Sequence, residues 1–178
     1  MPPRLSVFIA SSLDGYIATR DGKLDWLMSA AGSDEDYGYA AFMGTVDALA
    51  MGRGTYDFIA DVSPWPFSGK QVFVFTHRPP AARQGVTFWA IPPSKALARW
   101  SEAGLQRVYV DGGRLIRAFL AEGLIDDLTI TLVPRLLGDG IPLFRTLGRE
   151  TRLLLQGSTV FPSGMVTLSY TRALPGVP

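Results

Sequence analysis

Residues 5–15 read LSVFIASSLDG and form the first segment with a strong structural preference. The run Leu5–Ala10 is apolar and rich in residues that favour strands, and it ends at the polar pair Ser11-Ser12. The Asp14-Gly15 pair that follows marks a turn. We therefore expect a buried strand that ends in a polar loop, and similar segments recur along the chain.

Strands and helices alternate beyond this segment. Apolar runs predict strands at 47–51, 70–76, 86–90, 107–111 and 127–133, and helical spacing predicts helices at 55–60, 92–103 and 114–122. The last part of the chain predicts a hairpin of strands 153–160 and 165–172. This order predicts a three-layer α/β/α fold, in which a mostly parallel central sheet carries helices on both faces and ends in an antiparallel hairpin.

Two further segments separate the first two strands. Residues 14–24 contain two Asp-Gly pairs and are expected to form a long ordered loop. Ser33 is a good N-cap, and Asp34, Glu35 and Asp36 would fill the first turn of a helix that begins there.

Length and composition restrict the class of protein. The 178 residues suit a single domain over 1–178, with 174–178 expected to be a frayed tail. A formal net charge of +1 gives no reason to expect nucleic acid as a partner, and no apolar run approaches the length of a membrane span. There is no cysteine and only one histidine, His77, so a metal site built from these residues is impossible. Without a signal-peptide pattern, we expect a cytoplasmic protein.

Three glycine-marked or polar turns follow predicted strands. Gly52, Arg53, Gly54 and Thr55 lie between a strand and a helix, where backbone N–H groups and a guanidinium suit a phosphate. A tight turn with a solvent-facing arginine explains the same residues equally well. Because the carboxyl ends of parallel strands share one edge of the sheet, the three turns are expected to converge there.

The other two turns carry weaker signals. Gly112-Gly113 suits a pyrophosphate that rests on backbone N–H groups, although close strand–helix packing also requires glycine. The sequence there is not the G-x-G-x-x-G dinucleotide fingerprint. Thr76 and Arg78 suit a terminal phosphate monoester such as the one that distinguishes NADPH from NADH, and a polar loop is the alternative.

The order of the motifs resembles the dihydrofolate reductase-like superfamily, and more specifically its branch that contains the reductase domain of bacterial riboflavin biosynthesis. The resemblance covers residues 4–172. It is carried by FIASSLDGYIA (8–18), DWL (25–27), MGRGTY (51–56), VFVFTHRP (72–79), VYVDGG (108–113) and LTITLVPRLLGDGIPLF (128–144). The chain lacks the signatures of the zinc deaminase domain that is often fused to this reductase.

This resemblance implies NADPH as the cofactor and hydride transfer as the reaction. Ala10 and Ile17 would border the nicotinamide, and Thr76 and Arg78 would meet the 2′-phosphate. The remaining cofactor residues would be Gly52, Arg53, Gly54 and Thr55 on the phosphate side, Gly112 and Gly113 at the pyrophosphate, and Leu115 and Ile116 at the start of the helix beneath it.

Asp36 is the candidate catalytic residue. In dihydrofolate reductases, an acid on a helix binds the pteridine ring and lies a fixed distance before the Met-Gly-Arg segment. The same distance counted back from Met51 leads to Asp36. An acid in the first turn also stabilises a helix without any role in function. Other candidates for contact with substrate are Ser12, Asp14, Trp26 and Tyr56, each of which also suits packing or a turn. A water positioned by Asp36 or Ser12 would deliver the proton.

We therefore predict an NADPH-dependent reductase of a small heterocyclic or imine-like substrate. The favoured substrate resembles 5-amino-6-(5-phosphoribosylamino)uracil of riboflavin biosynthesis, and a pterin or dihydrofolate ranks second. The alternatives are a non-catalytic NADPH-binding sensor or scaffold, and a domain that binds no nucleotide. The resemblance also implies a homodimer.

Overall fold

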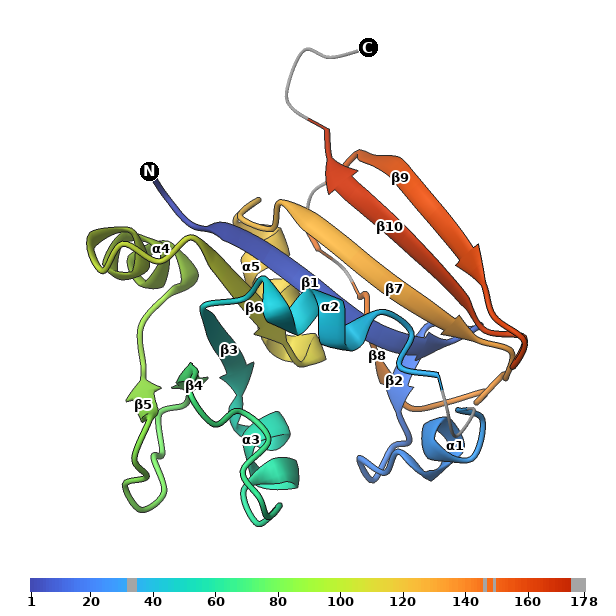
Figure 1. The fold of residues 1–178 in the computed structure, drawn as a ribbon, viewed down its shortest axis with the longest axis horizontal. Coiled ribbons are helices and arrows are strands. Elements are labelled where there is room, and N and C mark those ends of the chain that lie inside the picture. Colours follow the sequence, from blue (N-terminus) through green and yellow to red (C-terminus); the bar gives the residue numbers. More distant parts are fainter. Residues whose placement is uncertain (32–34, 146, 149, 174–178) are drawn as a thin grey trace.

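An eight-stranded sheet forms the centre of the computed structural model, which describes residues 1–31, 35–145, 147–148 and 150–173 (Figure 1). The strand order is β5-β4-β3-β6-β1-β7-β10-β9. The strands are β1 (Arg4–Ser12), β3 (Ala48–Gly52), β4 (Gln71–Phe75), β5 (Val86–Trp89), β6 (Arg107–Asp111), β7 (Asp127–Val133), β9 (Leu153–Val160) and β10 (Val166–Arg172).

Strands β1 and β3–β7 are parallel, and β10 pairs antiparallel with both β7 and β9. The predicted mostly parallel sheet with an antiparallel terminal hairpin is therefore confirmed. Because the parallel strands point the same way, their carboxyl ends lie along one edge of the sheet.

The pairing of β1 is unequal on its two sides. Residues 6–12 of β1 pair with β7 along their whole length, whereas only residues 4–6 pair with β6. The carboxyl-terminal half of β1 is thus not bonded to β6. The sheet is split between β1 and β6 at the edge where the strand ends gather, which is the usual position of a ligand crevice in open α/β sheets.

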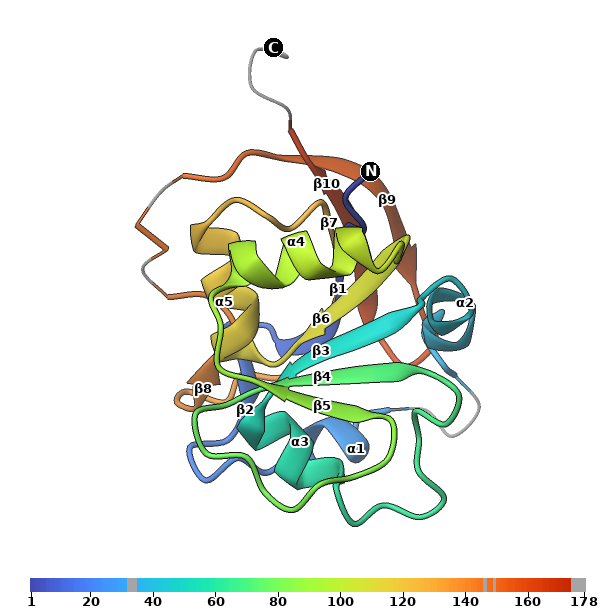
Figure 2. The same cartoon turned by 90° about the vertical axis from the view of Figure 1, so that its left-hand side faces the viewer.

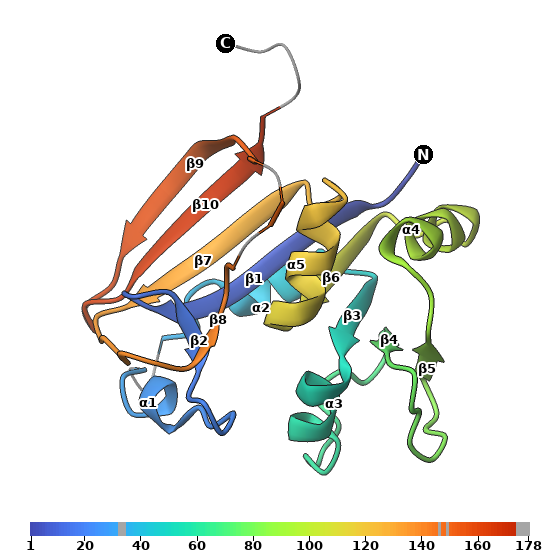
Figure 3. The same cartoon turned by 180° about the vertical axis from the view of Figure 1, so that it is seen from behind.

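Helices cover both faces of the sheet. Helices α4 (Pro93–Glu102) and α5 (Gly113–Ala121) pack on one face, and α2 (Tyr39–Gly44) lies on the other (Figures 2 and 3). Helix α3 (Arg53–Ile59) follows β3 directly at the carboxyl edge. Pro93 begins α4 as expected, since proline at the first helical position loses no hydrogen bond.

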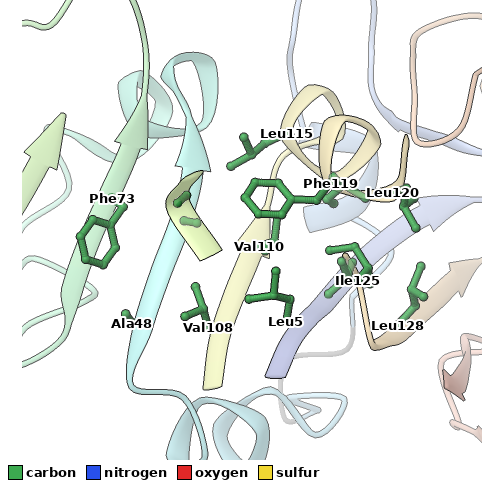
Figure 4. Close-up of a cluster of buried hydrophobic side chains, with 14 of the residues drawn as sticks. Leu5, Ala48, Phe73, Val108, Val110, Leu115, Phe119, Leu120, Ile125 and Leu128 are labelled. Atoms are coloured by element: carbon green, nitrogen blue, oxygen red, sulfur yellow. The ribbon is translucent and has the colours of Figure 1, made fainter. Parts of the chain in front are cut away.

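The largest core lies between α5 and the sheet. Figure 4 shows Leu115, Phe119 and Leu120 of α5 above strand residues that include Leu5 and Val110. Burial of these apolar side chains is the main force that holds the helix on the sheet. Strand residues alternate between faces, so Val108 and Val110 join this core whereas Tyr109 joins a second core under α2.

Two local predictions need correction. The expected loop 14–24 contains a short strand, β2 (Tyr16–Ala18), which pairs with β8 (Ile141–Pro142), and a one-turn helix, α1 (Asp25–Met28), follows it. The second helix begins at Tyr39 rather than at Ser33, because Gly38 adopts a left-handed conformation (φ +86°) at its start.

Some predictions fall on parts of the chain outside the described residues. These are the proposed N-cap Ser33, the neighbouring Asp34 and the tail 174–178. Glu35 and Asp36 are described, and both precede the helix instead of filling its first turn.

Candidate active site

The three predicted turns meet at the carboxyl edge of the sheet. The Arg53 guanidinium donates a hydrogen bond to the backbone oxygen of Arg78, which joins the first turn to the third. The first turn also meets the second, because a Cβ atom placed on Gly112 would lie 2.5 Å from Thr55 Oγ1. Residues from three separate strand ends therefore form one continuous strip, as the parallel order predicted.

Gly52 and Gly54 leave open space in this strip. A Cβ atom on either residue would meet no heavy atom within 4 Å, and neither residue has a positive φ. Neither the packing of the chain nor its backbone conformation requires glycine here. The exposed backbone beside Arg53 and Thr55 is free for close approach of a bulky group, which side chains at these positions would obstruct.

Gly112 and Gly113 have a different physical basis. Gly112 adopts φ +88° and has no room for a side chain against Thr55. A Cβ on Gly113 would lie 2.8 Å from Ile17 Cδ1 and 3.3 Å from the backbone oxygen of Pro142. Close packing accounts for both glycines, and it also places the start of α5 against β2.

The residues predicted to follow Gly113 lie in the core. Leu115 and Ile116 are buried in the first turns of α5. The Ile116 N–H donates to the backbone oxygen of Gly112. They support the helix from below rather than line its surface, and the exposed side chain at its start is Arg114.

A cavity of about 400 Å³ lies at the ends of β4 and β5, next to the third turn. The Thr76 hydroxyl accepts a hydrogen bond from the Arg78 N–H (3.1 Å), and Arg78 and His77 are exposed. The cavity is lined by Phe75, Thr76, His77, Trp89, Ala90, Ile91 and Pro92. It combines a flat aromatic wall with polar groups at the mouth.

A second cavity, of about 320 Å³, opens on the α2 face of the sheet. Ala10 lies in its wall, and β1 packs against β2, which carries Ile17. The wall comprises Phe8, Ala10, Leu27, Met28, Ala31, Glu35, Asp36, Tyr37, Tyr39, Thr131 and Met165. Ala10 therefore borders the cavity, whereas Ile17 lies against Gly113 in the second turn, and their contact with a nicotinamide stays a prediction.

Asp36 lines the second cavity, but its carboxylate is already engaged. Its two oxygens accept hydrogen bonds from the N–H groups of Gly38 (2.9 Å) and Ala40 (3.0 Å). These bonds hold the pKa of Asp36 below its ordinary value. Asp36 therefore caps the start of α2 and stays ionised, which suits an acceptor for substrate N–H groups better than a proton donor.

The other predicted substrate residues have structural partners. Ser12 donates to Asp14 (2.6 Å), and Asp14 accepts from the N–H groups of Leu137 (3.1 Å) and Gly138 (2.7 Å), which pins two loops together. Trp26 is buried against Val133 and Met165.

Tyr56 is buried edge-on to Trp65 and Phe88. The turn and packing roles that the sequence left open thus have direct support for Ser12, Asp14, Trp26 and Tyr56. Their contact with substrate stays a prediction.

Sequence reasoning missed Asp111, at the carboxyl end of β6 beside the split in the sheet. Burial raises the pKa of its carboxyl from 3.8 to about 6, against the opposing effects of the Gly112 N–H (2.7 Å) and the Tyr109 hydroxyl. Burial and the Asp111 charge together raise the pKa of Tyr39 to about 12. The sequence does contain one signal for this residue, because Asp111 is an acid at the end of an apolar strand and stands directly before two glycines.

In residues 1–31, 35–145, 147–148 and 150–173, no three acidic or histidine side chains gather to hold a metal ion. Within the same ranges, no helix is long and apolar enough to cross a membrane.

The sheet order, the split between β1 and β6, and the strip of turns define a dihydrofolate reductase-like fold. Dihydrofolate reductase from Enterococcus faecalis, solved in complex with NADP(H), aligns over 96% of this chain and 97% of its own with a TM-score of 0.68 and 16% identity.

The chain belongs to the RibD C-terminal domain family, whose profile matches residues 66–167. It is 38% identical to the uncharacterized protein YwjB of Bacillus subtilis, over 97% of this chain and all of that protein. A putative riboflavin biosynthesis protein from Shewanella sp. PV-4 superposes with a TM-score of 0.88 at 39% identity, over 98% of this chain and all of its own. The suspected superfamily and branch are confirmed.

Proposed function

We propose that this protein is an NADPH-dependent reductase that transfers a hydride to a small, flat heterocyclic or imine-like substrate. The observation that carries the proposal is the open backbone at Gly52 and Gly54, since no feature of the fold requires glycine at either position. The Arg53 guanidinium lies in the same strip, where it donates to the Asp57 carboxylate and to the backbone oxygen of Arg78. Open backbone beside arginine suits the phosphates of a dinucleotide.

The order of the features along the edge favours one orientation of the cofactor. The nicotinamide would lie by Ala10 and Ile17, next to the second cavity. The pyrophosphate would cross the open backbone by Gly52 and Gly54. The 2′-phosphate and adenosine would then reach Thr76 and the first cavity, whose aromatic wall suits a purine ring.

The second cavity would hold the substrate. When bound, NADPH supplies the hydride, which adds to the carbon of a C=N or conjugated double bond. Asp111 would supply the proton to the nitrogen or oxygen at the other end of that bond, so that one hydride and one proton complete the reduction. A carboxyl with a pKa of about 6 is protonated often enough near neutral pH to act as a general acid, and solvent would reprotonate it.

Asp36 and Tyr39 would position the substrate. Asp36 is held as an acceptor by the start of α2, and Tyr39 lines the cavity and interacts with Asp111. Tyr39 and Tyr109, on both of which the Asp111 charge acts, keep their protons because the pKa of each hydroxyl is raised. In this proposal Asp36 stays ionised and binds the substrate, whereas Asp111 titrates and transfers the proton.

Steady-state oxidation of NADPH, followed at the nicotinamide absorbance with a panel of aminopyrimidines, pterins and cyclic imines, tests this proposal. Turnover with at least one compound, and its loss in Asp111→Asn with NADPH affinity unchanged, is the expected result. Tight NADPH binding with no turnover across the panel would favour the sensor or scaffold alternative. Absence of NADPH binding would remove the proposal altogether.

A further inference from the structure

The wall of the second cavity has an unusual balance of charge. Apolar and aromatic side chains make up most of it, among them Phe8, Leu27 and Met165. Glu35 and Asp36 contribute two carboxyl groups, and no described residue in the wall is basic. A cavity of this kind attracts ring systems and N–H groups and repels anions.

Glu35 is fixed at the cavity wall by a contact from the far end of the chain. The Ser163 hydroxyl, in the turn between β9 and β10, donates to the Glu35 carboxylate (2.8 Å). The Tyr37 hydroxyl in turn donates to Ser163 (3.3 Å), and the Tyr37 ring lies edge-on to Phe161. Glu35 is therefore held in place by a defined network, and it lies beside Asp36 in the wall.

Among the described residues that line the cavity, none supplies a compensating positive charge. Asp111, which interacts with the cavity residue Tyr39, adds a third carboxyl group on the same side of the sheet. Arg135 reaches α1, where it donates to the Ser29 hydroxyl (3.0 Å), but it is exposed and does not line the cavity.

We infer that the substrate of this cavity carries no phosphate and is a flat, largely apolar ring that presents amino or ring N–H groups to Glu35 and Asp36. The inference rests on the proposed function, and it narrows the substrate class. A phosphate monoester carries a charge of about −1.5 to −2 at neutral pH and would face two carboxylates without a cation to pair with. The favoured phosphoribosyl compound of riboflavin biosynthesis is thus replaced by a dephosphorylated or unrelated amino-heterocycle.

A matched pair of ligands tests this inference directly. The probes are 5-amino-6-(ribosylamino)uracil and its 5′-phosphate, which differ only in the phosphate group. Calorimetric titration into the protein with NADP⁺ present is expected to show binding of the riboside at least about tenfold tighter than of the phosphate. Tighter binding of the phosphate would overturn the inference, and no binding of either compound would overturn the amino-ring assignment.

A charge insertion provides the matched control. Met28 lines the cavity and is 72% exposed, so that a longer side chain there stays solvated and leaves the core intact. Met28→Arg is expected to improve binding of the phosphate about tenfold relative to the riboside, whereas Met28→Gln should keep the ratio of the two affinities that the unaltered protein shows. A phosphate preference in the unaltered protein that disappears in Arg135→Gln would identify Arg135 as a phosphate ligand and refute the inference.

The same experiment separates this inference from the proposed function. NADPH affinity is measured independently for each variant. Normal NADPH binding with a preference for the phosphate compound would refute the substrate class alone. Loss of NADPH binding from the unaltered protein would refute the reductase, whatever the cavity prefers.

Discussion

Gly54→Ala should have opposite effects on folding and on cofactor binding. Gly54 lies in α3, and a Cβ atom added there meets no heavy atom within 4 Å. Alanine is favoured over glycine in a helix by about 0.5–1 kcal/mol, so the variant should be more stable by up to that amount. The same methyl group would occupy the open space where a phosphate approaches the backbone, and we expect NADPH affinity to fall at least about tenfold, or about 1.4 kcal/mol.

Urea denaturation and a fluorescence titration with NADPH measure the two effects on the same preparation. Gly44→Ala is the matched control, because Gly44 also lies in a helix, also has open space at its Cβ position, and precedes the amino end of β3, whereas the first turn follows its carboxyl end. It should raise stability without any change in NADPH affinity. Unchanged NADPH binding in Gly54→Ala would refute the argument that the open backbone is kept for the cofactor.

Three further predictions follow from single contacts. Asp111 has a folded-state pKa above its unfolded value, so the protein loses stability as the pH rises from about 4 to above 6. In urea denaturation, Asp111→Asn should therefore be more stable than the unaltered protein by about 2–3 kcal/mol at pH 8 and similar to it at pH 4. An equal difference in stability at both pH values would contradict the raised pKa. Arg78→Ala should weaken NADPH binding by about 10- to 100-fold and leave NADH binding unchanged, and an equal loss for both would place Arg78 away from the 2′-phosphate. The chain should form a homodimer, since β9 is an edge strand of the sheet with Leu155 and Val160 exposed, and a monomer in sedimentation equilibrium would disprove this.

The fold could be predicted in detail where local sequence and tertiary structure favour the same conformation. The run 127–133 is apolar and rich in β-branched residues, and β7 occupies the same seven residues. The start of α2 could not be predicted in this way. The acids after Ser33 resemble a capped first turn, but Gly38 interrupts the helix and Asp36 caps it from outside.

The candidate site could be predicted less completely, because many of its residues lie far apart in the sequence. The convergence of the three turns followed from the parallel strand order alone. The second cavity joins Phe8 of β1, Tyr39 of α2, Thr131 of β7 and Met165, which precedes β10, and these residues share no local motif. The sequence predicts Asp111 only as the last residue of a strand. Its unusual feature is the pKa that burial raises, and the burial of a single carboxyl depends on neighbours that a sequence does not reveal.

The central claim is that the strip of turns binds NADPH. Titration of the purified protein with NADPH and with NADH, followed by energy transfer from tryptophan to the nicotinamide, tests it directly, because Trp26 belongs to the same cluster as Ala10, beside the proposed nicotinamide position. We expect saturable binding of both nucleotides, with clear preference for NADPH. No binding of either nucleotide would contradict the central claim.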